Sequence, residues 1–341
     1  MAERAFALRP ALADAADSLE ARLLRHDGRK STSMEQMTLR FLAAPTDLGY
    51  SGNVDGGRVL EWIDRAGFAL ASAWSGHYCV TAYVGNVQFS RPVRPGHLVE
   101  VTARLAHTGR SSMHIEVVVR SVDPRGGALT EATKCLVIFV AVDADGRPVA
   151  VPDWVPTTSA ERDTQARAVR RIELRDAIES AMADQRYSDQ GTALQVTLRF
   201  LAAPTDINWG GKVHGGIVMR WIDEAAHVVA TRWTDSQGNV AVYSGGIRFY
   251  RPLLIGDLVE VDARLLHTGT SSMHIGVHVR SGDPRKKQLL VTTHCLTVFV
   301  ALDVEGRGIP CRRWEPASQE DLALDAHAVA LVGLRDAVRE D

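Results

Sequence analysis

The feature that most constrains this chain is that most of its sequence occurs twice. MTLRFLAAPTD at 37–47 returns as VTLRFLAAPTD at 196–206, and HTGRSSMHIEVVVRSVDPR at 107–125 returns as HTGTSSMHIGVHVRSGDPR at 267–285. The offset is 159 residues for the first pair (37 to 196) and 160 for the second (107 to 267), so one residue has been inserted between them. Such a unit is far longer than a solenoid repeat. We therefore predict two similar domains that pack as a pseudo-dimer within one chain.

Each unit reads as one strand, one long helix and four further strands. VTLRFLA alternates and is rich in β-formers, and a glycine-rich turn follows it. The next stretch, Arg58–Trp74 or Ile217–Trp233, carries apolar residues at helical spacing. A single helix across an antiparallel sheet would cover one apolar face, which predicts the α+β class. The later strands are expected at 79–89, 97–107, 112–121 and 133–143.

Composition excludes several function classes. Hydrophobic residues make up 45% and charged residues 23%, with a net charge of −2, and no basic block suggests a nucleic-acid partner. No apolar run reaches the length of a transmembrane helix, and the first residues do not resemble a secretory signal. The four cysteines lack C-x-x-C spacing, and Cys135 and Cys295 sit in apolar runs, which fits a reducing, cytoplasmic setting.

Motifs for other chemistries are missing from the sequence. There is no H-E-x-x-H or clustered Cys/His spacing for a metal, and no G-x-S-x-G nucleophile elbow. There is no G-x-G-x-x-G or P-loop either. We therefore expect chemistry that needs no bound cofactor or metal.

Three shared motifs carry a family resemblance. G-x-V-[DH]-G-G-x(6)-D stands at the head of each long helix, an FxRPxxxGDxVEV-like strand pair follows, and TGxSSMxI comes next. The ordered set, found twice, resembles the hotdog-fold acyl-CoA thioesterases, in particular the cytosolic acyl-CoA hydrolase type with two fused hotdog domains. The resemblance spans nearly all of both repeats. It implies that each antiparallel sheet wraps around one long central helix.

The resemblance also implies an activity and an assembly. The activity is hydrolysis of acyl-CoA to a free carboxylic (fatty) acid and coenzyme A, with coenzyme A entering as part of the substrate. The fused chain would act as the equivalent of a dimer, and a homo-oligomer such as a trimer of double hotdogs is implied. The expected boundaries are hotdog domain 1 with an N-terminal extension at 1–157, a helical connector at 158–190, hotdog domain 2 at 191–316 and a C-terminal helix at 317–341.

In that family each active site combines groups from two hotdog domains. A helix start supplies a backbone N–H that polarises the thioester carbonyl, a carboxylate on the other long helix activates water, and an Asn before the Gly-Gly turn positions water or the carbonyl. Carried over to this chain, one complete site would contain Asp64, Asn208 and Gly215. The second would pair Asp223 with Gly56 and would be weak or vestigial, because Gly49 stands where the Asn belongs.

The residues themselves support the carboxylate and leave its role open. Asp64 has Leu60 and Phe68 as i±4 neighbours, so it lies on or beside the apolar stripe of its helix. Burying a carboxylate there costs free energy unless it is paired or has a catalytic role. The alternative is that Asp64 faces the solvent. The carboxylate could act as a general base or attack the carbonyl directly. Asn208 could contribute only to a turn, and Gly215 could serve only helix entry.

Further residues are candidates for binding the substrate. His214 and Gly216 flank the helix start, and the TGRSS and TGTSS turns could hold a phosphate, with a plain β-turn as the alternative. Those turns supply Arg110, Ser111, Ser112, Ser271 and Ser272. Arg91 and Arg251, at strand ends, could meet phosphates or pair with an acid. The tryptophans Trp62, Trp74, Trp209 and Trp221 could line the pocket or fill the core.

Two other functions remain open. A hotdog dehydratase or enoyl-CoA hydratase would keep the fold, but the pattern of Asp64 and Asn208 is that of the hydrolases. A non-catalytic acyl-CoA binder or sensor would need an output module, and no helix-turn-helix pattern is visible. Release of coenzyme A, followed with a thiol-detecting dye, distinguishes the hydrolase from both.

Overall fold

Both repeats adopt the predicted arrangement of a sheet with one long helix. The computed structural model describes residues 34–183, 188, 191–236, 238–303 and 305–337. The predicted N-terminal extension, residues 1–33, lies outside the described residues, as does part of the connector. Residues 34–341 form one compact unit.

The first repeat contains one long helix and six strands. The helix α2 (Gly56–Ser75) begins two residues earlier than predicted, with Asp55 as its N-cap. The predicted strand at 79–89 is two strands, because the chain leaves the ladder between Val84 and Val87. The strands are β1 (Gln36–Leu42), β2 (Tyr78–Val84), β3 (Val87–Phe89), β4 (Leu98–Thr108), β5 (Ser112–Val122) and β6 (Thr130–Val142).

The second repeat follows the same order. Its helix α4 (Gly215–Thr234) has His214 as N-cap and again starts two residues before the predicted position. Its counterpart of β2 and β3 is one continuous strand, β8. The strands are β7 (Gln195–Leu201), β8 (Asn239–Phe249), β9 (Leu258–Thr268), β10 (Ser272–Gly282) and β11 (Leu290–Ala301).

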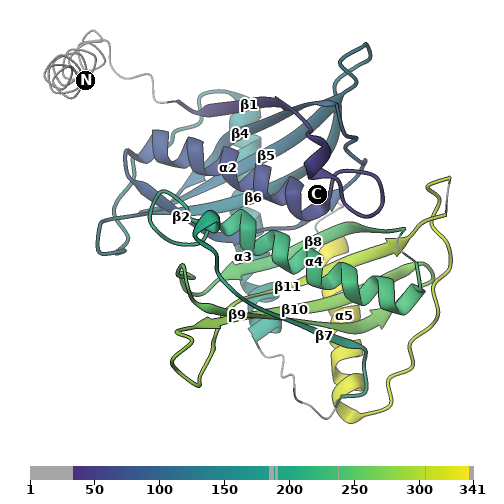
Figure 1. Ribbon diagram of the computed structural model, residues 1–341. Coiled ribbons are helices and arrows are strands. Elements are labelled where there is room, and N and C mark those ends of the chain that lie inside the picture. Colours follow the sequence, from purple (N-terminus) through teal and green to yellow (C-terminus); the bar gives the residue numbers. More distant parts are fainter. Residues whose placement is uncertain (1–33, 184–187, 189–190, 237, 304, 338–341) are drawn as a thin grey trace, which may run out of the picture. The chain divides into compact units, whose positions relative to one another are not determined.

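The two halves share one antiparallel sheet. Its strand order is β1-β4-β5-β6-β2-β8-β11-β10-β9-β7, with β3 pairing with β6 and β8. β2 and β8 join the repeats through the pairs Tyr83↔Arg248 and Val84↔Ile247. Figure 1 shows α2 and α4 side by side, each against its own half of this sheet. The predicted intrachain pseudo-dimer of two hotdog domains is confirmed.

Close contact between the two long helices explains one glycine of each Gly-Gly pair. A Cβ on Gly216 would lie 2.7 Å from the Cα of Glu61, and a Cβ on Gly57 would lie 2.7 Å from the Cα of Arg220. Any side chain would therefore push the helices apart. The apolar faces below include Ile63 and Ile222, both fully or almost fully buried, and each contributes about 1.5–3 kcal/mol by leaving water.

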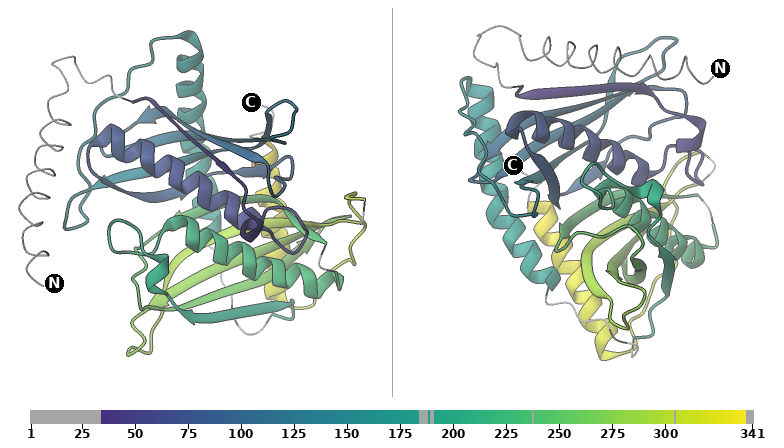
Figure 2. Two further views of the ribbon diagram at one scale, coloured as in Figure 1. Left: turned by 45° about the horizontal axis from the view of Figure 1, so that its top comes forward. Right: turned by 60° about the vertical axis from the view of Figure 1, so that its left-hand side comes forward.

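Two further helices cover the opposite face of the sheet. α3 (Ser159–Ala183) and α5 (Gln319–Ala337) lie together there, as both views of Figure 2 show. A small apolar cluster holds them, in which Ile178 and Met182 pack with Leu324 and Leu331. Among the described residues, no helix has the length and apolarity to cross a membrane.

Candidate active site

Two cavities lie at the N-termini of the long helices, each shared between the repeats. The first, here the Asp64 cavity, has a volume of about 410 Å³ and is lined by residues that include Asp64, Asn208, His214 and Gly215. The second, the Asp223 cavity, has a volume of about 520 Å³ and includes Asp223. The structure thus brings the three residues of the predicted complete site to one cavity.

Asp64 is a buried carboxylate held by three donors. Its side chain projects from α2, and the residue is 2% exposed. Oδ1 accepts a hydrogen bond from the Thr81 hydroxyl at 2.5 Å. Oδ2 lies 2.9 Å from the Gly216 backbone nitrogen and 2.9 Å from Nδ1 of His214. Donors from both repeats therefore fix the orientation of this carboxylate.

His214 is the residue that completes this arrangement. Its Nδ1 caps α4 by accepting from the Gly216 N–H at 3.1 Å, and when protonated it donates to Asp64, because a carboxylate only accepts hydrogen bonds. Burial lowers the pKa of His214, but the hydrogen bond and the charge of Asp64 outweigh it, and the pKa is raised above its usual value. The histidine therefore faces Asp64 as a donor, rather than acting as an independent base.

The start of α4 presents backbone donors to the cavity. Among the described residues, the Gly215 N–H has no acceptor, while the next N–H, of Gly216, is used by Asp64. A Cβ on Gly215 would lie 3.2 Å from Oδ2 of Asp64 and 3.1 Å from the Thr81 hydroxyl. Gly215 thus leaves space for a ligand next to a free N–H at the positive end of a helix.

Asn208 lines the same cavity, but its side chain stabilises a turn. Its Oδ1 accepts from the backbone N–H groups of Gly210 and Lys212, and its Nδ2 donates to the Val213 carbonyl at 3.3 Å. The amide also hydrogen-bonds the phenol of Tyr78, whose pKa burial raises to about 12. The turn role foreseen as the alternative is therefore present, and a role toward a substrate is left as a proposal.

Sequence reasoning missed Thr81. It lies on β2, seventeen residues after Asp64, and no local motif marks it. A signal did exist, because with the offset of 160 its counterpart in the second repeat is Ala241. A hydroxyl in one copy and a methyl group in the other is a difference that the comparison of repeats could have detected.

The tryptophans divide between the cavity and the core. Trp209 lines the Asp64 cavity, is 76% exposed and stacks on Phe68 with 4.9 Å between ring centroids. Trp62, Trp74 and Trp221 are buried in the core. Trp209 is thus the tryptophan placed to meet a ligand in this cavity.

The Asp223 cavity keeps the glycine contact of the Asp64 cavity but differs in the other groups around its carboxyl. Asp223 Oδ2 accepts from the Gly57 N–H at 3.0 Å, the counterpart of the bond from Gly216. The N-cap here is Asp55, and Ala241 replaces the threonine. Burial, followed by the neighbouring Asp55 carboxyl, raises the pKa of Asp223 well above its usual value. Burial and Asp55 thus favour the protonated form of this carboxyl, which cannot accept a proton from water.

Most of the residues predicted to bind a phosphate lie elsewhere. The two turns begin the strands β5 and β10, and none of their five candidates lines the Asp64 cavity: Arg110, Ser111, Ser112, Ser271 and Ser272. Arg251 does line it, and Arg91 lines the Asp223 cavity, which also contains Gly56. In the described part of the chain, no group of three His, Cys, Asp or Glu side chains could hold a metal ion.

Both repeats are similar to known thioesterases. The family described as "Thioesterase superfamily" matches residues 51–128 and 210–288, once in each repeat. The human cytosolic acyl coenzyme A thioester hydrolase is 26% identical over 298 residues, covering 81% of this chain and 77% of the relative. A putative oleoyl thioesterase from Lactobacillus plantarum shares the fold across 80% of this chain and 98% of its own, with a TM-score of 0.54 and 10% identity.

Proposed function

We propose that the chain, both repeats of which match the thioesterase superfamily, hydrolyses acyl-CoA thioesters to a carboxylic acid and coenzyme A. The observation that carries the proposal is the Asp64 cavity. There a buried carboxylate from one repeat faces the N-terminus of the long helix of the other repeat, beside a backbone N–H that is free among the described residues.

The cavity offers the two groups that thioester hydrolysis needs. As water attacks the carbonyl carbon, Asp64 takes its proton, and such base catalysis contributes about 10²–10⁴-fold. The carbonyl oxygen gains negative charge, which the Gly215 N–H and the helix dipole stabilise, and one such donor is worth roughly 3 kcal/mol. Collapse of the tetrahedral intermediate then expels the thiolate of coenzyme A. Direct attack by Asp64 to form an anhydride uses the same placement.

The surrounding groups orient the Asp64 carboxylate and the Gly215 N–H. Thr81 and His214 hold both oxygens of Asp64, so the carboxylate meets water in one orientation. Asn208 shapes the turn that leads into Gly215 and places its amide at the cavity wall. We propose that it aligns the water or the thioester carbonyl. His214 and Gly216 would then act on the substrate through Asp64.

We propose one working site per chain. The Asp223 cavity has no counterpart of Asn208, His214 or Thr81, and burial and Asp55 raise the pKa of its carboxyl and so favour the protonated form. A protonated acid cannot remove a proton from water. Gly56 and Asp223 therefore form a vestigial copy of the site.

The broader assignments are proposals as well. We place the two hotdog domains at 1–157 and 191–316, joined by the connector and closed by the C-terminal helix. We propose a cytoplasmic enzyme, without a resident cofactor or metal, that acts as a homo-oligomer. The relatives' names mention acyl coenzyme A and the cytosol, which supports the substrate class and the compartment.

A substrate panel tests the proposal. The purified chain is incubated with acyl-CoAs of increasing chain length, and free thiol is followed with a dye. We expect release of coenzyme A, with one preferred range of chain length. Binding without thiol release would favour an acyl-CoA binder, and loss of the enoyl absorbance from an enoyl-CoA without thiol release would favour a hydratase.

A further inference from the structure

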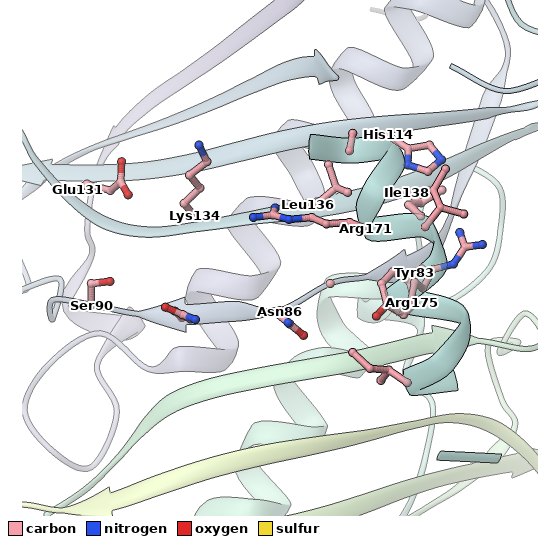
Figure 3. A pocket seen from close by; sticks show the side chains of 15 residues that line it. Tyr83, Asn86, Ser90, His114, Glu131, Lys134, Leu136, Ile138, Arg171 and Arg175 are labelled. Carbon is pink, nitrogen blue, oxygen red and sulfur yellow. The ribbon is translucent and has the colours of Figure 1, made fainter. Parts of the chain in front are cut away.

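A second cavity lies on the other face of the sheet, and we propose that it binds an amphipathic monocarboxylate, an anion with a short hydrocarbon tail. This α3 cavity has a volume of about 360 Å³ and lies between α3 and the first half of the sheet. Figure 3 shows it, with Arg171 and Arg175 on α3 close to Leu136 and Ile138 of the sheet. Its lining shares no residue with the Asp64 cavity.

The charge that recognises the anion is on Arg171. Two other cations of the cavity are already neutralised, since Arg175 pairs with Asp176 and Glu179, and Lys134 pairs with Glu116 at 2.7 Å. Arg171 forms no ion pair with any carboxylate in the described part of the chain.

The lining includes one acid, Glu131, at the exposed end of the cavity. In Figure 3 it lies beyond Lys134, away from Arg171. A guanidinium without a partner is the group that binds a carboxylate in bidentate fashion.

A buried histidine adds a second polar group. His114 is 4% exposed and lines the cavity, and its Nδ1 has no hydrogen-bond partner among the described residues. Burial lowers the pKa of His114 to about 3, so the imidazole is neutral and can donate or accept.

Part of the remaining lining is apolar and suits a hydrocarbon tail. Ile172 and Ile178 of α3 and Leu136 and Ile138 of β6 line the cavity, and Asn86, Gln88 and Ser90 add neutral polar groups. A volume of about 360 Å³ falls near the lower end of small-molecule sites, roughly 300–1,000 Å³. One charge, neutral polar groups and an apolar wall together favour a carboxylate with a short hydrocarbon tail over inorganic phosphate or a neutral lipid.

The second repeat has a cavity at the corresponding place but lacks the arginine. With the offset of 160, His274, Val298 and Val332, which line a cavity of about 500 Å³, correspond to His114, Ile138 and Ile172. Ser90 and Lys134 correspond to Tyr250 and His294, which hydrogen-bond each other at 3.0 Å. Arg171 corresponds to Leu331, so the cationic group belongs to the cavity of the first repeat.

Octanoate is the probe, and calorimetric titration is the measurement. The choice of a fatty acid rests on the proposed function, whereas the anion chemistry of the cavity does not. We expect Arg171→Gln to weaken octanoate binding at least tenfold. Arg170→Gln, which removes the same charge from an exposed neighbouring position on α3, should bind like the parent. Octanol and inorganic phosphate should bind far more weakly than octanoate.

A filling variant separates this site from the hydrolytic cavity. Ser90→Tyr introduces the residue that the second repeat carries, so it should keep the parent melting temperature and lose octanoate binding. Equal effects of Arg171→Gln and Arg170→Gln, or octanoate binding that survives Ser90→Tyr, would overturn the proposal. Hydrolysis by Arg171→Gln in the absence of octanoate should match the parent. If no acyl-CoA is cleaved at all, the titration still reports on the α3 cavity.

Discussion

Changing Asp64 and Asp223 to Asn, one at a time, should have opposite consequences. Both are buried acids at the same place on their helices, and both accept a hydrogen bond from a glycine N–H of the other helix. They differ in their neighbours. Asp64 faces a histidine and a hydroxyl, whereas Asp223 faces the carboxyl of Asp55. The substitution therefore removes a base in one cavity, whereas in the other a neutral amide replaces an acid whose protonated form is favoured by burial and by Asp55.

The expected magnitudes follow from these contacts. Loss of a general base costs about 10²–10⁴-fold in kcat, or about 2.7–5.4 kcal/mol in the barrier at 1.36 kcal/mol per tenfold. Asp64→Asn also loses charge-assisted hydrogen bonds, each worth about 1.5–3 kcal/mol, so its melting temperature should fall. Asp223→Asn should keep the parent kcat.

The stability of Asp223→Asn depends on the sign of a pKa shift. The pKa of Asp223 is higher in the folded chain than in the unfolded one. Above the unfolded value the unfolded chain releases this proton more readily, so the native Asp223 costs stability at neutral pH. Asn removes that cost, and the melting temperature should rise or stay unchanged at pH 7.

Thiol release from a good acyl-CoA substrate, measured beside thermal unfolding, tests both changes. Equal losses of kcat in the two variants would refute the one-site mechanism. Parent activity in Asp64→Asn would refute the role of the carboxylate, provided that the variant is folded.

Three further outcomes follow. Thr81→Ala should lower kcat about 10- to 150-fold, since a hydrogen bond to a charged group is worth about 1.5–3 kcal/mol. The matched control Ala241→Thr should leave kcat unchanged. An unchanged kcat in Thr81→Ala would exclude Thr81 from the mechanism. Acid should destabilise the fold between pH 6.5 and 4, because burial, as the largest cause, lowers the pKa of His114 to about 3 and of His294 to about 4. In that pH range the unfolded chain binds more protons than the folded chain. The free energy of unfolding of His114→Gln should depend less on pH than that of the parent, and an identical pH dependence would contradict this reasoning. Trp209→Ala should raise KM for acyl-CoA with little change in kcat, and steady-state kinetics in which only kcat changes would exclude a binding role.

Much of the fold was predictable because the sequence repeats itself. Two copies of one strand and helix pattern require a pseudo-dimer, and the alternation of apolar residues places the strands. The break between β2 and β3 was not predictable. Both β2 and β3 pair with β6 and with β8 of the other repeat, and such long-range pairing leaves no local mark in the sequence.

The candidate site was predictable where its residues share a helix or a turn. Asp64 and Gly215 stand at fixed positions relative to the Gly-Gly motif, and the structure places them in contact distance across the interface. His214 was predicted as a candidate for binding the substrate, whereas the structure places its Nδ1 2.9 Å from Oδ2 of Asp64. Thr81 was missed because its approach to Asp64 depends on how β2 lies against α2.

The asymmetry of the two cavities shows which unit of this chain is specialised. Thr81 comes from the first repeat, while Asn208 and His214 come from the second, yet all three line the Asp64 cavity. Neither repeat is therefore the better-equipped copy. Each contributes functional groups to one cavity and their replacements to the other, because the two sites form diagonally across the packed helices. A comparison of the two repeats would therefore find neither better equipped for catalysis. A comparison of the two cavities finds Thr, His and Asn in the Asp64 cavity where the Asp223 cavity has Ala, Asp and Gly.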